Sequence, residues 1–455
     1  MKLRLAGVVF GLVFLAGCVP DLVSVSRDGT IALTLTKDGR FDPLDGDGQQ
    51  LYLTDAKADF LTAIEGMDKC FCPQIAPSGK AIVAQSKDGL VLFERSARRQ
   101  RVIYSPPKGA GDVSASFPVW SPDEKRIAFF VGDFGEDVPD CKLYVYDVKR
   151  KELEVVAHRT SPRATWLPNG KRLFYVSFSA AAFEKGAPPF GDLKRINVET
   201  LKQITVATEQ MLPYSKTALF PDGKAILFPC ASWDHMEISR RGLTVPLVLK
   251  KQTFSLPAKA GKAGAQPQEA GKLTEPKANP GAETAQPADT VEEGAEGGSI
   301  VIDGDQSLSH YGCAVSPDGE RIAFGRYFWE DGSAAASPEK EAAGGQPAQK
   351  KPAPGEAASA ETKHSDPDGI EFCVAKADGT EVVVVARCRV EALFGQVIWL
   401  TSTRLLCVTP EKIIAVDADG SNSFDLTATI KTKFADQFAP EEKAAAEQPT
   451  KAKRQ

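Results

Sequence analysis

The sequence is poor in the residues and motifs that most enzyme sites need. Its 455 residues include only four histidines, His158, His235, His310 and His364. It contains no HExxH zinc motif, no GxSxG nucleophile elbow and no phosphate-binding glycine loop. No Cys-x-x-Cys pair is present that would support a zinc site. We therefore expect no cofactor and no bound metal, and the sequence favours a binding protein over an enzyme.

Positive charge and long apolar segments are also lacking. The 55 Lys and Arg residues are outnumbered by 60 Asp and Glu residues, which gives a net charge of −5. A mildly acidic chain argues against a nucleic-acid partner and against a general attraction to anionic lipid. No segment after the N-terminus approaches the roughly 20 apolar residues that a spanning helix needs. We expect a monomer.

The N-terminus has the form of a processing signal. Lys2 and Arg4 precede an apolar stretch of 13 residues, 5–17, and Leu-Ala-Gly-Cys at 15–18 matches the lipobox of bacterial lipoproteins. Cleavage before Cys18 would expose this residue for acylation and leave 53 cations against 60 acids, a net charge of −7. An ordinary secretory signal with a chance cysteine is the alternative. Val19 follows the cysteine, and by resemblance to the sorting rule of enteric bacteria this favours the outer over the inner membrane.

One short phrase recurs seven times along the rest of the chain. Its clearest copy is SPDGERIAF, and the copies begin at Ser26, Ala76, Ser121, Leu167, Phe220, Ser316 and Leu400. The first four gaps are 50, 45, 46 and 53 residues, which is the length of one four-stranded propeller blade. The last two gaps, of 96 and 84 residues, contain insertions.

Each copy predicts a strand, a tight turn and a buried strand. Proline presets the second turn position, and Asp and Gly suit the next two. We interpret Asp28, Asp123, Asp222 and Asp318 as turn residues, not as catalytic acids. A second hairpin follows, for example IEFCVAKADGTEVVVVA at 370–386 with a turn at Asp-Gly. Two hairpins make a four-stranded antiparallel sheet, so the chain is predicted to be all-β, a seven-bladed β-propeller, with six or eight blades as alternatives.

The phrase Ser-Pro-Asp-Gly-x-x-Ile-Ala-Phe resembles the WD-like repeat of TolB-like β-propellers. It also resembles repeats in the propellers of prolyl-oligopeptidase relatives and of some polysaccharide lyases. The resemblance covers residues 22–430 or so and implies a fold, because this scaffold carries many different activities.

Two segments interrupt the predicted propeller of residues 18–436. Residues 258–298 and 332–368 are rich in Ala, Pro, Gly, Glu and Lys, and so is the tail 437–455. Such a composition buries too little apolar surface to offset the entropy of ordering, so we expect disorder in all three. The first insertion is expected between the third and fourth strands of the fifth blade, and the second between the two hairpins of the sixth.

Eight cysteines remain after the lipidated one, and an exported protein permits disulfides among them. We expect one or two structural disulfides together with buried thiols, and leave the pairing open. Cys407 takes the place of Phe129 in its repeat and is predicted to be a core residue. Cys70 and Cys72 are an alternative redox or metal pair. The other cysteines are Cys141, Cys230, Cys313, Cys373 and Cys388.

The best candidate surface is formed by the connections between the second and third strands of the blades. These connections would emerge on one face of the ring, and exposed aromatic rings grouped on loops indicate recognition. Packing of the rings under their own loops is the alternative. The candidate partner-binding residues are Phe134, Phe183, Phe190, Trp233, His235, Tyr327, Phe328 and Trp329.

Three functions remain open at this stage. The first is a cell-envelope scaffold that binds a protein or glycan partner through this face. The second is a propeller enzyme, a polysaccharide lyase or hydrolase, with acids and histidines converging on the central channel; Asp234, His235 and Glu237 near His310 are the candidate set. The third is a structural part of an envelope assembly.

Overall fold

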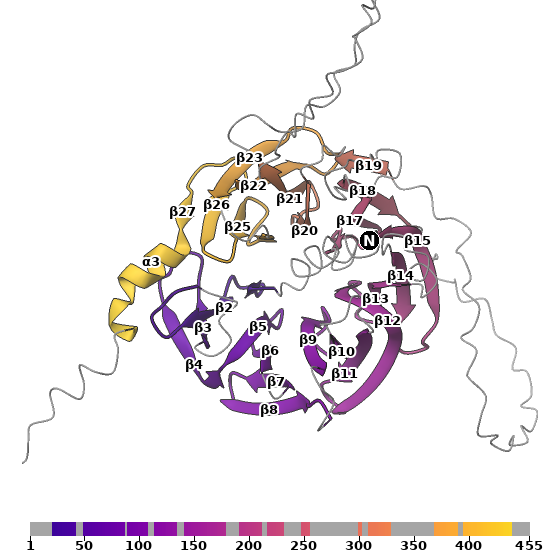
Figure 1. Ribbon diagram of the computed structural model, residues 1–455, viewed down its shortest axis with the longest axis horizontal. Helices are drawn as coiled ribbons and strands as arrows, with labels where there is room; N and C mark the ends of the chain where they lie inside the picture. The colour runs from indigo at the N-terminus through magenta and orange to yellow at the C-terminus, as the bar shows by residue number, and fades with distance from the viewer. Residues whose placement is uncertain are drawn as a thin grey trace, which may run out of the picture.

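The computed structural model shows antiparallel sheets arranged in a ring around a central axis (Figure 1). The residues it describes are 21–41, 49–86, 89–107, 113–133, 141–178, 191–211, 216–231, 247–254, 299–302, 308–328, 368–389 and 395–438. Within these ranges no helix is both long and apolar enough to cross a membrane.

The strands follow one another in chain order, in groups of four that we number as units one to seven. Unit one is β1 (Val23–Val25), β2 (Ile31–Thr36), β3 (Gln49–Thr54) and β4 (Leu61–Asp68); unit two is β5 (Cys70–Ile75), β6 (Ala81–Ser86), β7 (Gly89–Glu94) and β8 (Arg99–Tyr104). Units three and four share one sheet: β9 (Val113–Trp120), β10 (Arg126–Asp133), β11 (Cys141–Asp147), β12 (Glu152–Trp166), β13 (Arg172–Ser177), β14 (Gly191–Asn197) and β15 (Gln203–Met211). Unit five is β16 (Ala218–Leu219), β17 (Ala225–Ala231), β18 (Leu247–Thr253) and β19 (Ser299–Ile302). Unit six is β20 (Leu308–Val315), β21 (Arg321–Phe328), β22 (Gly369–Lys376) and β23 (Val383–Arg389); unit seven is β24 (Gln396–Trp399), β25 (Arg404–Val408), β26 (Ile413–Asp417) and β27 (Phe424–Asp425).

The long strand β12 joins units three and four. Residues 152–160 pair with β11, and residues 160–166 pair with β13. The first part is therefore the outer strand of unit three, and the second part is the inner strand of unit four. When its two parts are counted separately, the described strands form seven groups of four, as the repeats predict, and the number of blades itself stays a prediction.

The core consists of layers between neighbouring units, and the apolar run after each turn supplies two layers at once. In β10, Ile127 and Phe129 pack in the cluster shared with unit two, whereas Ala128 and Phe130 pack in the cluster shared with unit four. Successive strand residues point to opposite faces of a sheet, so a strand covered on both faces is apolar throughout. Cys407 lies in the layer between units six and seven and is fully buried, which confirms its predicted role.

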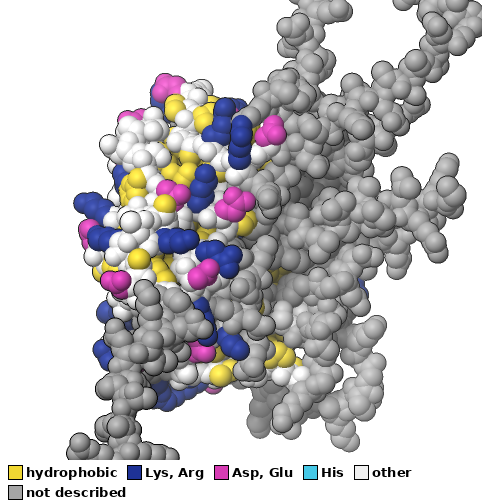
Figure 2. All heavy atoms as spheres, turned by 60° about the vertical axis from the view of Figure 1, so that its left-hand side comes forward, with side chains coloured by type: hydrophobic (Ala, Val, Ile, Leu, Met, Phe, Trp, Pro, Cys, Tyr) yellow, Lys and Arg dark blue, Asp and Glu magenta, His cyan; other side chains and the backbone are white. Residues whose placement is uncertain are grey.

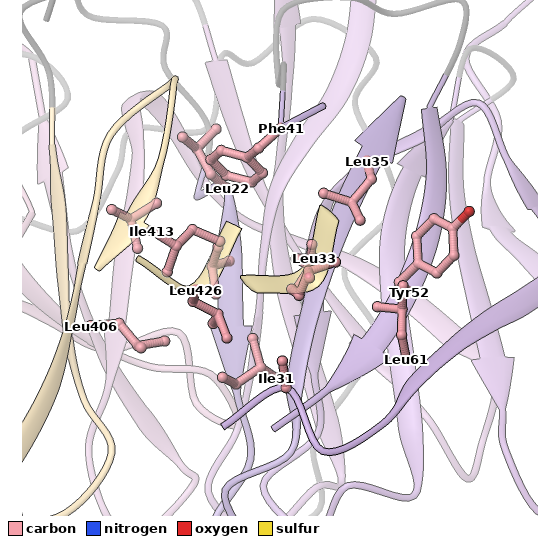
Figure 3. Close-up of a cluster of buried hydrophobic side chains, with 14 of the residues drawn as sticks. Leu22, Ile31, Leu33, Leu35, Phe41, Tyr52, Leu61, Leu406, Ile413 and Leu426 are labelled. Carbon is pink, nitrogen blue, oxygen red and sulfur yellow. The ribbon is translucent and has the colours of Figure 1, made fainter. Parts of the chain in front are cut away.

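Hydrophobic packing between units one and seven closes the ring (Figure 3). Ile31 and Leu33 of β2 lie in one cluster with Leu406 of β25 and Ile413 of β26. The side chain of Gln396 adds two bonds to the chain entering β1: its Nε2 donates to Val23 O (3.1 Å) and its Oε1 accepts from Leu22 N (3.2 Å). The first and last units each have their own four strands, as the sequence indicated, so no strand among the described residues is shared at the joint.

The C-terminal part of the described chain differs from the predicted hairpin. The fourth strand of unit seven has only two residues, and the chain continues as helix α3 (Leu426–Lys433) and a 3-10 turn, η2 (Ala435–Gln437). Asp425 caps the helix by accepting a bond from Ala428 N (2.9 Å). The side chains of Leu426 and Ile430 are fully buried. They pack in the cluster between units one and seven, which we call the closing cluster. The helix therefore covers the joint between the first and last units.

The Pro-Asp turns form a second ring at one end of the sheets. The carboxylate of Asp318 accepts bonds from Ser316 Oγ (2.5 Å) and Glu320 N (3.0 Å), and Asp123 and Asp28 accept the equivalent bonds. These bonds lower the pKa of Asp318, where the one from Ser316 contributes most. The aspartates thus have the turn role that the sequence predicted.

The cations that follow the turns connect neighbouring units. Arg126 donates to Gly170 O (2.8 Å) in the next turn, and Arg321 donates to Ser402 O (3.0 Å) in the turn of unit seven. On the rim near α3, Lys and Arg side chains alternate with Asp and Glu side chains without a large area of one sign (Figure 2).

Candidate functional site

The predicted lipidation site and most of the predicted partner-binding residues lie outside the described part of the chain. These are Cys18, Phe134, Phe183, Phe190, Trp233, His235 and Trp329. Tyr327 and Phe328 are described, at the end of β21. For the first group the predictions stay predictions.

The two described rings pack against side chains of unit six and of the layer that it shares with unit seven. Phe328 is 7% exposed, and the guanidinium carbon of Arg387 lies 4.9 Å from its ring centroid. Arg387 in turn pairs with Glu371, which also accepts a bond from Arg326 Nε (2.7 Å). Tyr327 packs against the cluster between units six and seven. The loop that follows these two rings lies outside the described residues, so their role in recognition stays a prediction.

Strand direction places the candidate loops at one end of the ring. In each unit the inner strand runs away from this end and the second strand returns to it, because the pairs are antiparallel. The second strands of units three to six end at Asp133, Ser177, Ala231 and Phe328. We call this end the loop face, and the end that carries the Pro-Asp turns the turn face. The first insertion connects β18 to β19 and so begins on the turn face, whereas the second connects β21 to β22 on the loop face.

A cluster of charged residues, which the sequence analysis missed, lies where the chain enters the ring on the loop face. Asp21 Oδ1 is 3.1 Å from a terminal guanidinium nitrogen of Arg163 and 3.3 Å from Lys216 Nζ. Asp21 Oδ2 accepts a bond of 3.5 Å from Gln74 Nε2. The Arg163 guanidinium also lies over the Phe117 ring, 4.7 Å from its centroid. We call these five residues the entry cluster.

The entry cluster joins units that are distant in the ring. Asp21 precedes β1 of unit one, whereas Arg163 lies in the inner part of β12 and Lys216 precedes β16 of unit five. Unit one packs against units two and seven through its core clusters, so units four and five belong to the opposite half of the ring. The ion pairs therefore bridge the central channel.

Electrostatics keeps Asp21 ionised. Burial is the largest influence and opposes ionisation, but Lys216 and Arg163 together outweigh it, so the pKa of Asp21 lies below its ordinary value. The side chains are 24% exposed for Asp21, 11% for Arg163 and 28% for Lys216. With two cations and one acid the entry cluster has one net positive charge, and its carboxylate is already bound.

Bulges in the inner strands bring these side chains to the channel. The register shifts between 71 and 74 in β5, near Phe117 in β9 and between 160 and 164 in β12. Each bulge contains a proline, Pro73, Pro118 or Pro162. Proline has no N–H to donate to a neighbouring strand. It is therefore tolerated in these inner strands, which are the edge strands that face the channel, and in bulges. Cys72 and Phe117, the residues before two of these prolines, have positive φ angles of 50° and 52°.

The sequence contained a signal for this site. A proline precedes the repeat phrase by three residues in units two and three and by five residues in unit four, within an otherwise strand-like segment. A proline in such a segment indicates a bulge or an edge. The contact between Asp21 and two residues more than 140 positions away depends on closure of the ring and had no local signal.

The cysteines correct the expectation of disulfides. Cys70, Cys72, Cys230, Cys313, Cys388 and Cys407 are buried free thiols, and Cys141 and Cys373 are buried in two different core clusters. Burial raises the pKa of Cys70 and Cys313 to about 12 and that of Cys230 to about 11. The thiolate is the reactive and metal-binding form, so these residues are apolar core groups at neutral pH.

The candidate acids and histidine Asp234, His235 and Glu237 lie outside the described residues, so their convergence on the channel stays a prediction. His158 is exposed on β12, and His310 lies in β20 with its side chain outside the described part. Within the described residues no group of three or more His, Cys, Asp or Glu side chains is arranged to hold a metal ion. What the described geometry offers at the channel is an ion-paired carboxylate, one of whose cations lies over an aromatic ring.

Known structures share the fold of this chain. The tricorn protease matches with a TM-score of 0.53 and 10% identity over 89% of this chain and 34% of that chain. Oligogalacturonate lyase from Vibrio parahaemolyticus matches with a TM-score of 0.50 and 11% identity over 87% of this chain and 88% of that one. TolB from Acinetobacter baumannii matches with a TM-score of 0.40 and 13% identity over 78% and 62%.

These similarities concern the fold. The chain spans about a third of the tricorn protease and less than two thirds of TolB. No family model and no curated protein matches the sequence. Together with the ring of antiparallel sheets, the matches to the tricorn protease and to oligogalacturonate lyase confirm the predicted β-propeller fold.

Proposed function

We propose that this chain is a lipid-anchored β-propeller of the bacterial cell envelope, held at the outer membrane. It binds a protein or glycan partner and performs no reaction itself. The lipobox before Cys18 supports the anchor. The common direction of the inner strands supports a single binding face, because it gathers the candidate loops at one end of the ring. That gathering is the observation on which the proposal rests.

The entry cluster fits this role. A site for acid–base chemistry needs a group whose protonation can change near neutral pH. Asp21 is instead kept ionised by Arg163 and Lys216, so the charges at the channel entrance bind one another. The propeller then serves as a rigid ring that presents loops.

Two measurements test the proposal. Intact mass of the protein from bacterial membranes should show acyl groups that Cys18→Ser removes. The pair Trp233→Ala and Trp329→Ala should abolish pull-down of an envelope partner and leave the melting temperature nearly unchanged, because rings on a binding face contribute little to the core.

A matched control is available on the turn face. Phe60 lies between β3 and β4 and is 38% exposed, so Phe60→Ala removes an exposed ring from the opposite end of the ring of sheets. This variant should keep the partner. Loss of the partner in Phe60→Ala, or a large fall in melting temperature in the Trp variants, would refute recognition through the loop face.

A further inference from the structure

The entry cluster fixes the place where the anchor leaves the fold. Asp21 is held over the channel by Arg163 and Lys216, and the following residue Leu22 is 3% exposed and bonded to Gln396. The chain is therefore fastened on both sides of the channel before β1 begins. Its exit is at the centre of the loop face and not at the rim.

The tether between this point and the anchor is short. Cys18 precedes Asp21 by three residues, and a fully extended chain spans at most about 3.6 Å per residue, so the acylated residue lies within about 11 Å of the entry cluster. The strands that separate the two faces are longer: β10, with eight residues, spans about 26 Å at about 3.3 Å per residue. The tether cannot reach around the ring to the turn face.

We propose that the loop face lies against the phospholipid surface that carries the anchor, and that the ion pairs of Asp21 hold the ring in this orientation. This rests on the proposed acylation of Cys18. The orientation places the partner of the proposed function at the membrane surface, within reach of the loop face, and leaves the turn face directed away from the lipid. Aromatic rings such as those of the candidate loops prefer the interface between lipid and water.

The test uses two labels on one sheet. Lys142, at the start of β11, is exposed on the loop face, and Lys125, in the turn before β10, is exposed on the turn face. Lys142→Cys and Lys125→Cys are labelled with a fluorophore in the acylated full-length protein, where the buried native thiols should not react. The protein is bound to vesicles of phosphatidylethanolamine and phosphatidylglycerol that contain a lipid with a spin-labelled headgroup. We expect at least about threefold stronger quenching at position 142, because Lys142 pairs with Val131, six residues along the strand from Lys125, so the two labels differ by roughly 20 Å in distance from the surface.

A second variant tests the ion pairs. Asp21→Asn in the same two labelled proteins removes the charge that Arg163 and Lys216 hold, so the ratio of quenching should fall by at least half. Asp38→Asn is the matched control, since Asp38 is exposed and its carboxylate binds the neighbouring Thr36 and Arg40, and it should keep the ratio. An unchanged ratio in Asp21→Asn would refute the role of the ion pairs.

The outcomes separate the two proposals. Acylated, vesicle-bound protein with equal quenching at both positions, or stronger quenching at 125, overturns the orientation and leaves the lipoprotein proposal intact. A mass without acyl groups, with vesicle binding equal to that of Cys18→Ser, overturns both.

Discussion

The joint between the first and last units should be a point where one side chain controls the stability of the whole ring. Ile430 of α3 is fully buried in the closing cluster, together with residues of β2, β25 and β26. Ile430→Ala removes three buried carbon atoms and leaves a cavity that the surrounding strands cannot fill. Such substitutions cost about 2–5 kcal/mol of unfolding free energy.

The size of the effect in a melting experiment follows from the size of the fold. With about 270 described residues and an unfolding entropy of about 2.1 cal/mol/K per residue, a loss of 2–5 kcal/mol lowers the melting temperature by about 4–9 °C. Lys431→Ala is the matched control, because Lys431 is exposed on the same helix and alanine favours helices. It should change the melting temperature by less than about 1 °C.

Calorimetry combined with hydrogen exchange checks the reasoning. In Ile430→Ala, amides of β2 and β25 should exchange faster than those of β17 in unit five, because the closing layer opens first. A loss of unfolding free energy smaller than about 1 kcal/mol, or equally faster amide exchange around the whole ring, would show that the joint is not held by this cluster.

Three further predictions concern other parts of the ring. Gly319→Ala should lower the free energy of unfolding by about 1–2 kcal/mol, since Gly319 has a φ of +77° and an added Cβ would lie 3.2 Å from Pro221 Cδ. Gly29 has a φ of +84° but open space around it, so Gly29→Ala should lower the free energy of unfolding by less. Equal urea unfolding midpoints for the two variants would contradict this. The folded pKa of Asp21 lies below its unfolded value near 3.8, so its contribution to stability is present above that pH and disappears as the pH falls through the folded pKa. Asp21→Asn should accordingly be less stable than the native protein at pH 7 and closer to it at pH 3, and a constant difference at both values would refute the assignment. The native protein should not react with a thiol-specific reagent at pH 8, whereas unfolding in urea should expose at least six thiols; rapid reaction of the folded protein would contradict the burial of the cysteines.

The sequence predicted those features that are encoded within one repeat. The turn residues of Ser316 to Gly319 and the apolar run of Ile127 to Phe130 carry their own structural rules, so the turns, the buried strands and the ring of sheets could be predicted. The placement of Cys407 followed in the same way, by comparison of one copy with another.

Features that depend on contacts between distant units could not be predicted. The helix after β27 forms because the closing cluster offers Leu426 and Ile430 an apolar surface, and its own eight residues are too few for a stable isolated helix. The ion pairs of Asp21 likewise require that unit one and units four and five face each other across the channel. The disulfides were expected from compartment and count, whereas six of the cysteines lie as free thiols within the apolar layers.

Closure without a shared strand has a consequence for how the number of units in such rings can evolve. Where the first and last units exchange a strand, both chain ends must match, and any change in the number of units must preserve that match. Here every unit is built from consecutive residues, and only units three and four are joined in one sheet, through β12. Duplication or deletion of one of the other units would therefore alter the diameter of the ring without disrupting a described sheet, and the adjustment would fall on the contacts of α3.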